Sequence, residues 1–239
     1  KWAPGTVGLS LTYCKTVFAW ALRQGLVTTN PFARIELPRR PVAVSFLSAD
    51  EVRSLLATAD RLAVPGVTAA RGLRALVHLA VRTGLRKGEL FGLRWADVEL
   101  DSGRLTIARS FASTPKSGRP RQLRLPAEVV PILRQWQKEC PPTRQAVLFP
   151  RRSRAGAWEM PRSATYMAGL PRLLAAAGCR PLIRPFHALR HTFASHYLMQ
   201  GGSLAVLQQI LGHSDLKHTL VYAHLTPDFL GTELNRVKF

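Results

Sequence analysis

Apolar residues recur at helical spacing along most of the chain, and this pattern predicts a mainly helical protein. The clearest stripe runs from Leu73 to Val81, with apolar side chains at i, i+3, i+4, i+7 and i+8. Gly84 follows and is expected to end this helix, because glycine readily adopts the left-handed conformation of a C-cap. Ser48 and Glu51 have the spacing of a capping box, which predicts that another helix begins there. Further helices are expected at residues 8–25, 87–93, 127–139, 162–177, 187–199, 204–211 and 215–223.

A central segment has a different pattern, in which short apolar runs alternate with polar and turn-forming residues. Short strands are expected at Val98–Leu100, Arg104–Arg109 and Gln122–Leu125, with a hairpin turn at Lys116–Gly118. Another short strand is expected at residues 147–149. Together the elements predict an α+β fold class, mainly α with a small antiparallel β-sheet.

A stiff, basic connector at residues 37–41, with the sequence LPRRP, separates a short helical segment from the rest of the chain. We therefore expect a domain boundary that divides residues 1–40 from residues 41–239. A helical piece as small as the first buries too little surface to be stable by itself. Because the chain begins at Lys1 rather than Met, this piece is expected to be the remnant of a larger N-terminal domain.

The charge of the chain is strongly positive. It carries 34 Lys and Arg against 14 Asp and Glu, which gives a formal net charge of +20. A compact domain repels itself at that charge, so a polyanionic partner such as nucleic acid is the natural explanation. A basic ribosome-associated protein and a basic protein without such a partner are the alternatives. Hydrophobic residues make up 46% of the chain, which is enough for a packed core and argues against wholesale disorder.

The three cysteines, Cys14, Cys140 and Cys179, lie far apart and form no CxxC motif. Their number and spacing argue against a disulfide framework or a zinc site, and they fit a reducing cytoplasm. No apolar run approaches the length of a membrane span, so no membrane partner is expected. Lys15 and Arg23 interrupt the apolar residues near the N-terminus, which argues against a signal peptide.

Several residues could carry chemistry, although each one also has an ordinary structural explanation. His187, Arg190 and His191 share one face of a predicted helix, as the residues of a solvated basic face also would. His187 and His191 could instead bind a metal as an i, i+4 pair, but the glutamate of an HExxH motif and a third ligand are missing. The other candidates are Arg86 with Glu89 as a local ion pair, Lys116 in a basic turn, His213 after a helix end, and Tyr222 as a packing residue.

Together these segments resemble the phage integrase family, the tyrosine recombinases. The resemblance covers residues 46–224, and its motifs occur in the family's order with compatible spacing. Thr83–Asp97 is similar to the first arginine box and His187–Ser195 to the second. The segment that ends in the nucleophile is represented by Leu211–Ser214 and Thr219–His224, and Lys116 matches the hairpin lysine.

The resemblance implies the fold of a tyrosine recombinase catalytic domain, preceded at residues 8–38 by part of the family's helical core-binding domain. It also implies DNA cleavage and rejoining through a 3′-phosphotyrosyl intermediate, without a cofactor, a metal or ATP. Arg86 and Arg190 are expected to bind phosphate oxygens through paired, permanently charged donors, with a hydrogen bond from His213. The remaining expected roles are Tyr222 as nucleophile, His187 as its base or positioning group, Lys116 as the acid for the departing 5′ oxygen, and Glu89 as support of the arginine network.

The partners implied by the resemblance are double-stranded DNA attachment sites and further copies of the chain, as a homotetramer on two duplexes. Accessory DNA-bending proteins are also expected, and the expected location is the bacterial cytoplasm, on the nucleoid. Exposed arginines are the natural contacts to the DNA backbone. The candidates are Arg39, Arg40, Arg119, Arg121, Arg151, Arg152 and Arg154.

The chain departs from the family pattern at two places. Ala188 occupies a position where many relatives carry an acid, which leaves the local tuning of His187 open. The tail after Tyr222 is short, which leaves the usual partner-docking helix open.

Three alternative functions remain at this stage. A type IB topoisomerase uses a similar set of residues, but the Leu-Gly-His213 and His187-x-x-Arg190-His191 forms favour a recombinase. A catalytically inactive DNA-binding protein with the same fold is less well supported, because the whole set of candidate catalytic residues is present. A metal-dependent nuclease is disfavoured, because clustered carboxylates are scarce.

Overall fold

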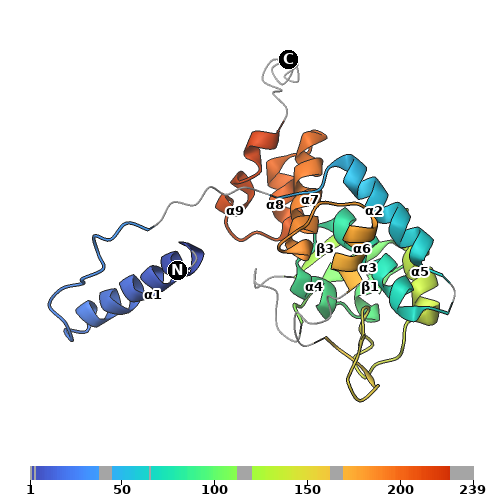
Figure 1. The fold of residues 1–239 in the computed structure, drawn as a ribbon, viewed down its shortest axis with the longest axis horizontal. Coiled ribbons are helices and arrows are strands. Elements are labelled where there is room, and N and C mark those ends of the chain that lie inside the picture. Colours follow the sequence, from blue (N-terminus) through green and yellow to red (C-terminus); the bar gives the residue numbers. More distant parts are fainter. Residues whose placement is uncertain are drawn as a thin grey trace. The chain divides into compact units, whose positions relative to one another are not determined.

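The computed structural model describes residues 2, 4–37, 45–64, 66–111, 120–161 and 169–226 (Figure 1). The chain divides into two compact units, which we call unit 1 (residues 1–43) and unit 2 (residues 44–239). The predicted boundary at residue 40, with Arg39 and Arg40, lies outside the described residues, and so do Lys116, Arg119 and the hairpin turn expected around them.

Unit 1 contains helix α1 (Pro4–Arg23), close to the bounds that the apolar spacing predicts. Phe18 on this helix packs against Phe32 beyond it, with ring centroids 5.2 Å apart. Helices in proteins gain most of their stability by burying an apolar stripe. Here Leu9, Tyr13, Val17 and Trp20, the apolar residues that recur at roughly helical spacing along α1, are each more than half exposed.

Unit 2 is built around helix α3 (Thr68–Thr83). This helix packs against α2 (Ala49–Leu62), α5 (Val129–Glu139) and α7 (Pro185–Met199). Helix α6 (Gly169–Ala176) covers part of α2 and α3. Figure 1 shows α2, α3 and α5 gathered on one side of unit 2, with α7 and the C-terminal helices on the other.

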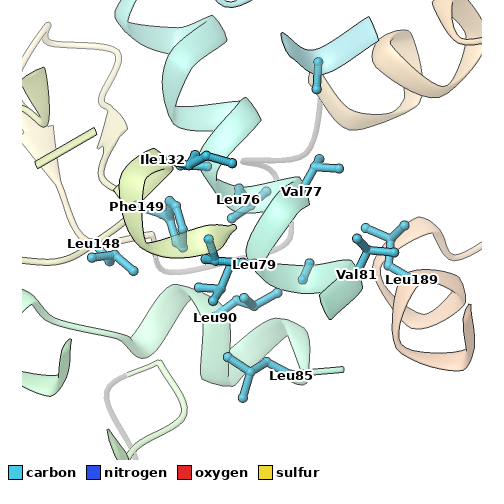
Figure 2. Packing of buried hydrophobic residues seen from close by; sticks show 14 of the residues in the cluster. Leu76, Val77, Leu79, Val81, Leu85, Leu90, Ile132, Leu148, Phe149 and Leu189 are labelled. Carbon is cyan, nitrogen blue, oxygen red and sulfur yellow. The ribbon is translucent and has the colours of Figure 1, made fainter. Parts of the chain in front are cut away.

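The stripe predicted for α3 lies in the hydrophobic core, as Figure 2 shows. Leu76, Val77 and Leu79 are at most 2% exposed, and Ile132 of α5 and Leu189 of α7 pack into the same cluster. Burial of one such side chain stabilises a fold by about 1.5–3 kcal/mol. The C-terminal end of α3 is therefore firmly placed, and the first arginine box follows directly after it.

The ends of two helices also follow the sequence predictions. In the capping box of α2, the Ser48 hydroxyl accepts a hydrogen bond from the backbone N–H of Glu51 at 3.1 Å. The Glu51 carboxylate in turn accepts one from the backbone N–H of Ser48 at 2.8 Å. Gly84 ends α3 in the left-handed conformation, with φ of 62°. Both predicted signals are thus confirmed.

A three-stranded antiparallel sheet forms in the central segment, as predicted. Its strands are β1 (Val98–Glu99), β2 (Arg104–Ile107) and β3 (Arg121–Arg124), in that order. Leu105 and Ile107 on β2 are fully buried, so one face of the sheet joins the core. In the register of the β2–β3 pair, Ile107 lies opposite Arg121.

The strand expected at residues 147–149 is not formed. Val147 makes only an isolated antiparallel bridge with Arg94, and the backbone N–H of Leu148 donates to the carbonyl of Leu93 at 2.9 Å. Pro150 follows at once and has no N–H to continue the ladder. A small hairpin of β4 (Arg151–Arg152) and β5 (Trp158–Glu159) comes next, which the pattern did not predict.

The C-terminal part of unit 2 contains α8 (Leu204–Leu211), α9 (Lys217–Leu220) and the short 3-10 helix η3 (Ala223–Leu225). The helix expected at residues 215–223 is therefore shorter than predicted, and Tyr222 lies in the turn between α9 and η3. The backbone N–H of Tyr222 donates to the carbonyl three residues earlier, the tighter pattern of a 3-10 turn. In the described part of the chain, no helix combines the length and the apolar character needed to cross a membrane.

Candidate active site

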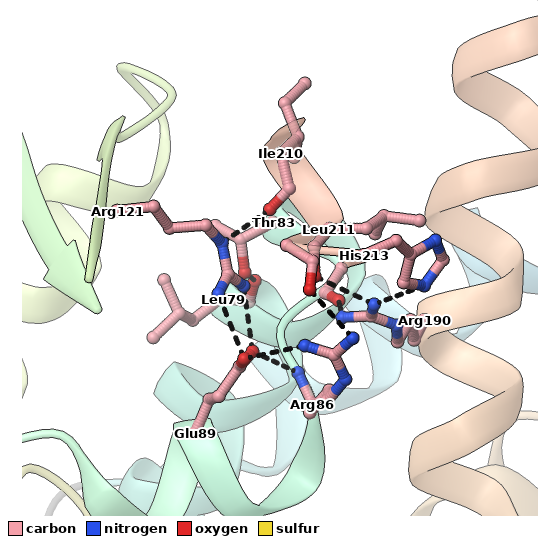
Figure 3. Close-up of polar contacts among 11 residues, drawn as sticks. Leu79, Thr83, Arg86, Glu89, Arg121, Arg190, Ile210, Leu211 and His213 are labelled. Atoms are coloured by element: carbon pink, nitrogen blue, oxygen red, sulfur yellow. Dashed lines mark hydrogen bonds and ion pairs between the residues drawn. The ribbon is translucent and has the colours of Figure 1, made fainter. Parts of the chain in front are cut away.

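Three predicted catalytic residues, Arg86, Arg190 and His213, gather with Glu89 in unit 2, where the ends of several elements meet (Figure 3). Arg86 directly precedes helix α4 (Lys87–Gly92), and Glu89 lies within that helix. Arg190 comes from the middle of α7, and His213 follows the end of α8. Residues more than 120 positions apart in the sequence are thus joined by direct hydrogen bonds, such as that between the Arg86 side chain and the carbonyl of Gly212.

Glu89 is the centre of a buried ion-pair network, and its side chain is fully buried. Arg86 donates to it from the backbone N–H at 2.9 Å and from Nη1 at 3.0 Å. Arg121 of β3 donates to both carboxylate oxygens, at 3.0 and 2.8 Å. Burial by itself raises the pKa of Glu89, but the hydrogen bonds and charges of Arg121 and Arg86 outweigh this effect and lower it. The carboxylate is therefore ionised at neutral pH and holds two guanidinium groups in place.

We expect Glu89→Gln to destabilise unit 2 at pH 7 by about 3 kcal/mol, because it leaves buried guanidinium groups without their counter-charge. A lowered folded-state pKa means that the ionised carboxylate stabilises the fold above its ordinary pKa of 4.5, and that this contribution is lost as the pH falls through the folded-state pKa. The difference between the two proteins should therefore shrink on acidification. Urea unfolding at pH 7 and pH 3 measures it, and an undiminished difference at pH 3 would contradict the ionised carboxylate.

Arg190 donates to three acceptors of the protein and is only 4% exposed. Its Nη1 donates to the carbonyl of Gly84 at 2.8 Å, and its Nη2 donates to the carbonyl of Leu211 at 2.9 Å and to Nε2 of His213 at 2.8 Å. Burial, followed by the charge of Arg86, lowers the pKa of Arg190 to about 9. The guanidinium is therefore still protonated at neutral pH, in a fixed orientation.

Two glycines at helix ends supply carbonyl groups to the two candidate arginines. Gly84 caps α3 and accepts from Arg190, and Gly212 caps α8 and accepts from Arg86 at 3.0 Å. Both have φ of 62°, a conformation that costs other residues about 1–2 kcal/mol. A Cβ on Gly84 would lie 2.5 Å from Cδ1 of Phe193, and one on Gly212 would lie 2.7 Å from Nη1 of Arg121. Neither position has room for a side chain.

We expect Gly84→Ala to destabilise unit 2 more than the matched change Gly178→Ala. Gly178 also has a positive φ, of 69°, but a Cβ there meets nothing within 4 Å. The control therefore reports backbone strain alone, whereas the collision at Gly84 adds about 1–3 kcal/mol. Equilibrium unfolding of both variants tests this, and equal losses would show that the close packing around Gly84 is unimportant.

His213 is neutral and its tautomer is fixed by its partners. Because Arg190 can only donate, Nε2 of His213 accepts, and Nδ1 carries the hydrogen and donates to the Thr219 hydroxyl at 2.8 Å. Burial, followed by the charges of Arg190 and Arg86, lowers the pKa of His213 to about 3. In this arrangement His213 positions Arg190 rather than offering a free donor.

Tyr222 is 2% exposed, and its hydroxyl is hydrogen-bonded to Nδ1 of His191 at 2.5 Å. Burial raises the pKa of Tyr222 to about 12, against a smaller opposing effect of the Arg190 charge. Burial, then the neighbouring His187 and the charge of Arg190, lower the pKa of His191 to about 4. The phenol is therefore protonated and the imidazole neutral, so the phenol donates and Nδ1 accepts.

A cavity of about 670 Å³ lies beside these groups. Arg86, His187 and Arg190 line it, together with the apolar side chains of Phe111 and Phe186. Partial removal of the ring from water, then the charges of Arg190, Arg184 and Arg86, lower the pKa of His187, so a neutral imidazole faces the cavity. A positively charged wall beside an apolar one suits a phosphodiester with its attached sugar.

Two residues of this site had not been assigned a catalytic or supporting role from the sequence. Arg121 was expected to contact DNA, but its guanidinium is largely buried against Glu89 and its Nε donates to the carbonyl of Ile210 at 2.8 Å. Its position on β3 was a usable signal, because it shares the strand face of the half-buried Leu123. His187 and His191 lie on the same face of the predicted helix. The sequence therefore gave no sign that His191, rather than His187, would contact the phenol of Tyr222.

The other predicted DNA contacts are spread over the surface. Arg151 on β4 pairs with Glu159 of β5 and is partly neutralised by it. Arg152 and Arg154 are exposed in the same hairpin and remain candidates for phosphate contacts. Within the described ranges, no group of three or more His, Cys, Asp or Glu side chains is arranged to hold a metal ion.

The family model and the relatives found by comparison with known proteins indicate the same family. Residues 45–228 match the model of the phage integrase family. The chain is 35% identical to tyrosine recombinase XerC of Xanthomonas campestris pv. campestris (strain B100) over 226 residues, which is 93% of this chain and 65% of that relative. It is 32% identical to tyrosine recombinase XerD of Ralstonia nicotianae (strain ATCC BAA-1114 / GMI1000), covering 92% of this chain and 69% of the relative.

Solved structures share the fold. The crystal structure of XerA recombinase matches with a TM-score of 0.61 and 25% identity, over 96% of this chain and 76% of that one. The Tn1549 transposon integrase in complex with transposon right end DNA matches with a TM-score of 0.76 and 22% identity, over 97% of this chain and 79% of that one. The predicted fold class, a mainly helical tyrosine recombinase catalytic domain with small antiparallel sheets, is thus confirmed. By its sequence over residues 45–228 and by its fold, the chain belongs to the phage integrase family, the tyrosine recombinases.

Proposed function

We propose that this chain is the catalytic part of a site-specific DNA recombinase that cleaves and rejoins DNA through Tyr222. The observation that carries the proposal is the assembly of Arg86, Arg190 and His187 around one cavity, with Tyr222 bound through His191 to the same helix as Arg190. The family and its relatives XerC and XerD support the same function. Within this proposal, residues 1–40 end a core-binding domain and residues 41–239 form the catalytic domain.

The two arginines supply the charge that phosphodiester cleavage needs. A DNA phosphate is anionic and repels a nucleophile, and its transition state gathers further charge on the non-bridging oxygens. Arg86 and Arg190 would neutralise these oxygens through paired donors, and His213 would keep Arg190 oriented. The Glu89 carboxylate, which is itself held by Arg121, accepts a hydrogen bond from Arg86. The Arg86 side chain therefore needs little rearrangement when DNA binds.

The chemical step then exchanges one phosphate ester for another. The Tyr222 oxygen forms a bond to phosphorus while the bond from phosphorus to the 5′ oxygen breaks. The departing 5′ oxygen takes a proton, for which Lys116 is the proposed donor. The 3′-phosphotyrosyl ester conserves the energy of the broken linkage, so attack by a free 5′-hydroxyl rejoins DNA without ATP.

The proposed substrate is a pair of double-stranded attachment sites, held by a homotetramer with accessory DNA-bending proteins and located on the bacterial nucleoid. A net charge of +20 and the exposed Arg152 and Arg154 favour a polyanionic partner. Relatives of the same fold are described in complex with DNA, such as XerH recombinase bound to its difH substrate.

Covalent capture tests the proposal without knowledge of the target sequence. The chain is incubated in EDTA with a library of nicked duplexes whose central sequences are randomised, and protein–DNA adducts that survive denaturation are sequenced. We expect adducts joined through Tyr222 to the 3′ phosphate, enriched for one sequence. Only non-covalent complexes would overturn the proposal and favour an inactive DNA-binding protein.

The enriched sequence then distinguishes a recombinase from a topoisomerase. Plasmids carrying one copy or two copies of it are incubated with the chain, and the products are separated on a gel. Exchange between the two copies is the expected result. Relaxation of plasmids with or without the sequence, in the absence of exchange, would favour a type IB topoisomerase.

A further inference from the structure

We infer that His191 orients the hydroxyl of Tyr222 and accepts its proton when the strand is cleaved. This inference rests on the proposed function and assigns a catalytic role that the sequence motifs had directed to His187. The inference concerns the surroundings of the Tyr222 hydroxyl. Arg86, Arg190 and His187 instead line the cavity proposed for the phosphate.

The contact between the two side chains is direct. Nδ1 of His191 lies 2.5 Å from the phenolic oxygen of Tyr222, and the ring centroids are 5.5 Å apart at an interplanar angle of 54°. This separation is within hydrogen-bond distance, so the phenolic O–H can donate directly to the acceptor nitrogen. The distance and the tilt allow proton transfer along an existing hydrogen bond, with no rearrangement of either ring.

The surroundings of the phenol keep this contact in place. The Tyr222 ring packs in a small hydrophobic cluster with Leu198 of α7 and with Leu207 and Leu211 of α8. His191 follows Arg190 on α7, so one rigid helix carries both the proposed phosphate-binding guanidinium and the proposed proton acceptor. A phosphate bound by Arg190 therefore arrives at a fixed position relative to the nitrogen that holds the nucleophile.

Two histidines on this helix have different neighbours. The His187 and His191 rings meet edge to face, with centroids 4.5 Å apart, but His187 lines the cavity and His191 contacts the phenol. We assign His187 to the phosphate and His191 to the nucleophile. The charged and titratable groups that act on His191 are His187 and Arg190 on its own helix, and Tyr222 from the turn after α9.

In the free protein the proton stays on the phenol, because the pKa of Tyr222 is about 12 and that of His191 is about 4. Two later events favour transfer, one at His191 when DNA binds and one at Tyr222 when the new bond forms. A phosphate anion at Arg190 offsets the positive charge that disfavours a charged His191, so the pKa of His191 rises. As the bond from the Tyr222 oxygen to phosphorus forms, the phenolic proton becomes far more acidic. The proton then moves to Nδ1, and the imidazolium returns it to Tyr222 when the strand is rejoined.

Single-turnover formation of the covalent adduct on a nicked duplex, captured as above, tests this role. His191→Asn can keep an acceptor oxygen near the position of Nδ1 but cannot take up the proton, and His191→Gln serves as a second variant. We expect either change to slow adduct formation by about 10²-fold or more, with unchanged non-covalent binding of the duplex. The control is His196→Asn on the same helix, whose ring contacts the carbonyl of Leu47 instead, and it should cleave at the wild-type rate.

A more acidic nucleophile separates proton transfer from a structural role. Fluorinated tyrosine, incorporated at position 222, needs less help to lose its proton and should restore much of the activity of His191→Asn while changing the wild type little. The variant's rate should also keep rising with pH where the wild-type rate has levelled off. Equal fluorotyrosine effects in both proteins, or wild-type rates in folded His191 variants, would overturn the inference and leave the proposed function intact. Absence of Tyr222 adducts in the wild type would instead remove the proposed function itself.

Discussion

Replacing Tyr222 by Phe is expected to abolish covalent attachment to DNA while the fold and non-covalent DNA binding persist. The phenylalanine ring fills the same cluster beside Leu207 and Leu211, so packing is kept and only the hydroxyl is lost. Loss of its hydrogen bond to His191 should cost about 1 kcal/mol of stability. Loss of the nucleophile should lower adduct formation by at least about 10³-fold, as removal of a nucleophile does in other enzymes.

The measurement is denaturing electrophoresis of adducts with a labelled nicked duplex, alongside native gel shifts of the same samples. Tyr197→Phe is the matched control, because Tyr197 lies on α7 and packs against Phe193 in the same cluster, with ring centroids 6.0 Å apart. The control should form adducts normally. Adducts of undiminished yield with Tyr222→Phe would assign the nucleophile to another residue.

The second large effect is expected for Arg190→Lys, which keeps the charge but removes the planar fork of donors. A single ammonium group cannot serve the carbonyls of Gly84 and Leu211, the ring of His213 and a phosphate together. Loss of transition-state stabilisation should lower single-turnover cleavage by roughly 10²–10³-fold. Unpaired buried acceptors should also destabilise unit 2 by about 1–3 kcal/mol.

Thermal or urea unfolding and adduct formation are measured in parallel for this variant. Arg124→Lys, at an exposed position of β3, is the matched control and should change neither quantity appreciably. A stable Arg190→Lys protein that cleaves at the wild-type rate would mean that Arg190 is a packing residue rather than a phosphate ligand. Loss of stability with full activity under native conditions would lead to the same conclusion.

Much of the fold could be predicted because its signals are local. The capping box at Ser48, the apolar stripe of α3 and the C-cap glycine Gly84 depend on neighbouring residues along the chain, and each behaves as expected. The strand expected at residues 147–149 shows the limit of such signals. An apolar run of that length fits a strand, but pairing depends on a partner segment and on the following proline.

The candidate site could be predicted only in part, because its details depend on contacts between distant segments. The sequence identified Arg86 with its partner Glu89, and it identified Arg190, His213 and Tyr222 without the partners that hold them. The pairing of Arg121 with Glu89 joins a strand to a helix 32 residues away, and the contact of His191 with the phenol spans 31 residues. No pattern along the chain specifies which of two neighbouring histidines turns toward the tyrosine.

The carbonyl acceptors that fix the two arginines have an evolutionary consequence. Arg86 is held partly by the backbone of residue 212, and Arg190 by the backbone of residues 84 and 211. Every amino acid carries a main-chain oxygen, so replacing Leu211 by another aliphatic residue alters packing without removing an acceptor. Gly84 and Gly212 resist such drift more strongly, since other residues adopt the required φ only at a cost and a Cβ at either position would collide with a neighbouring side chain. Homologous sequences can therefore diverge widely around the guanidinium groups while the groups themselves keep their positions.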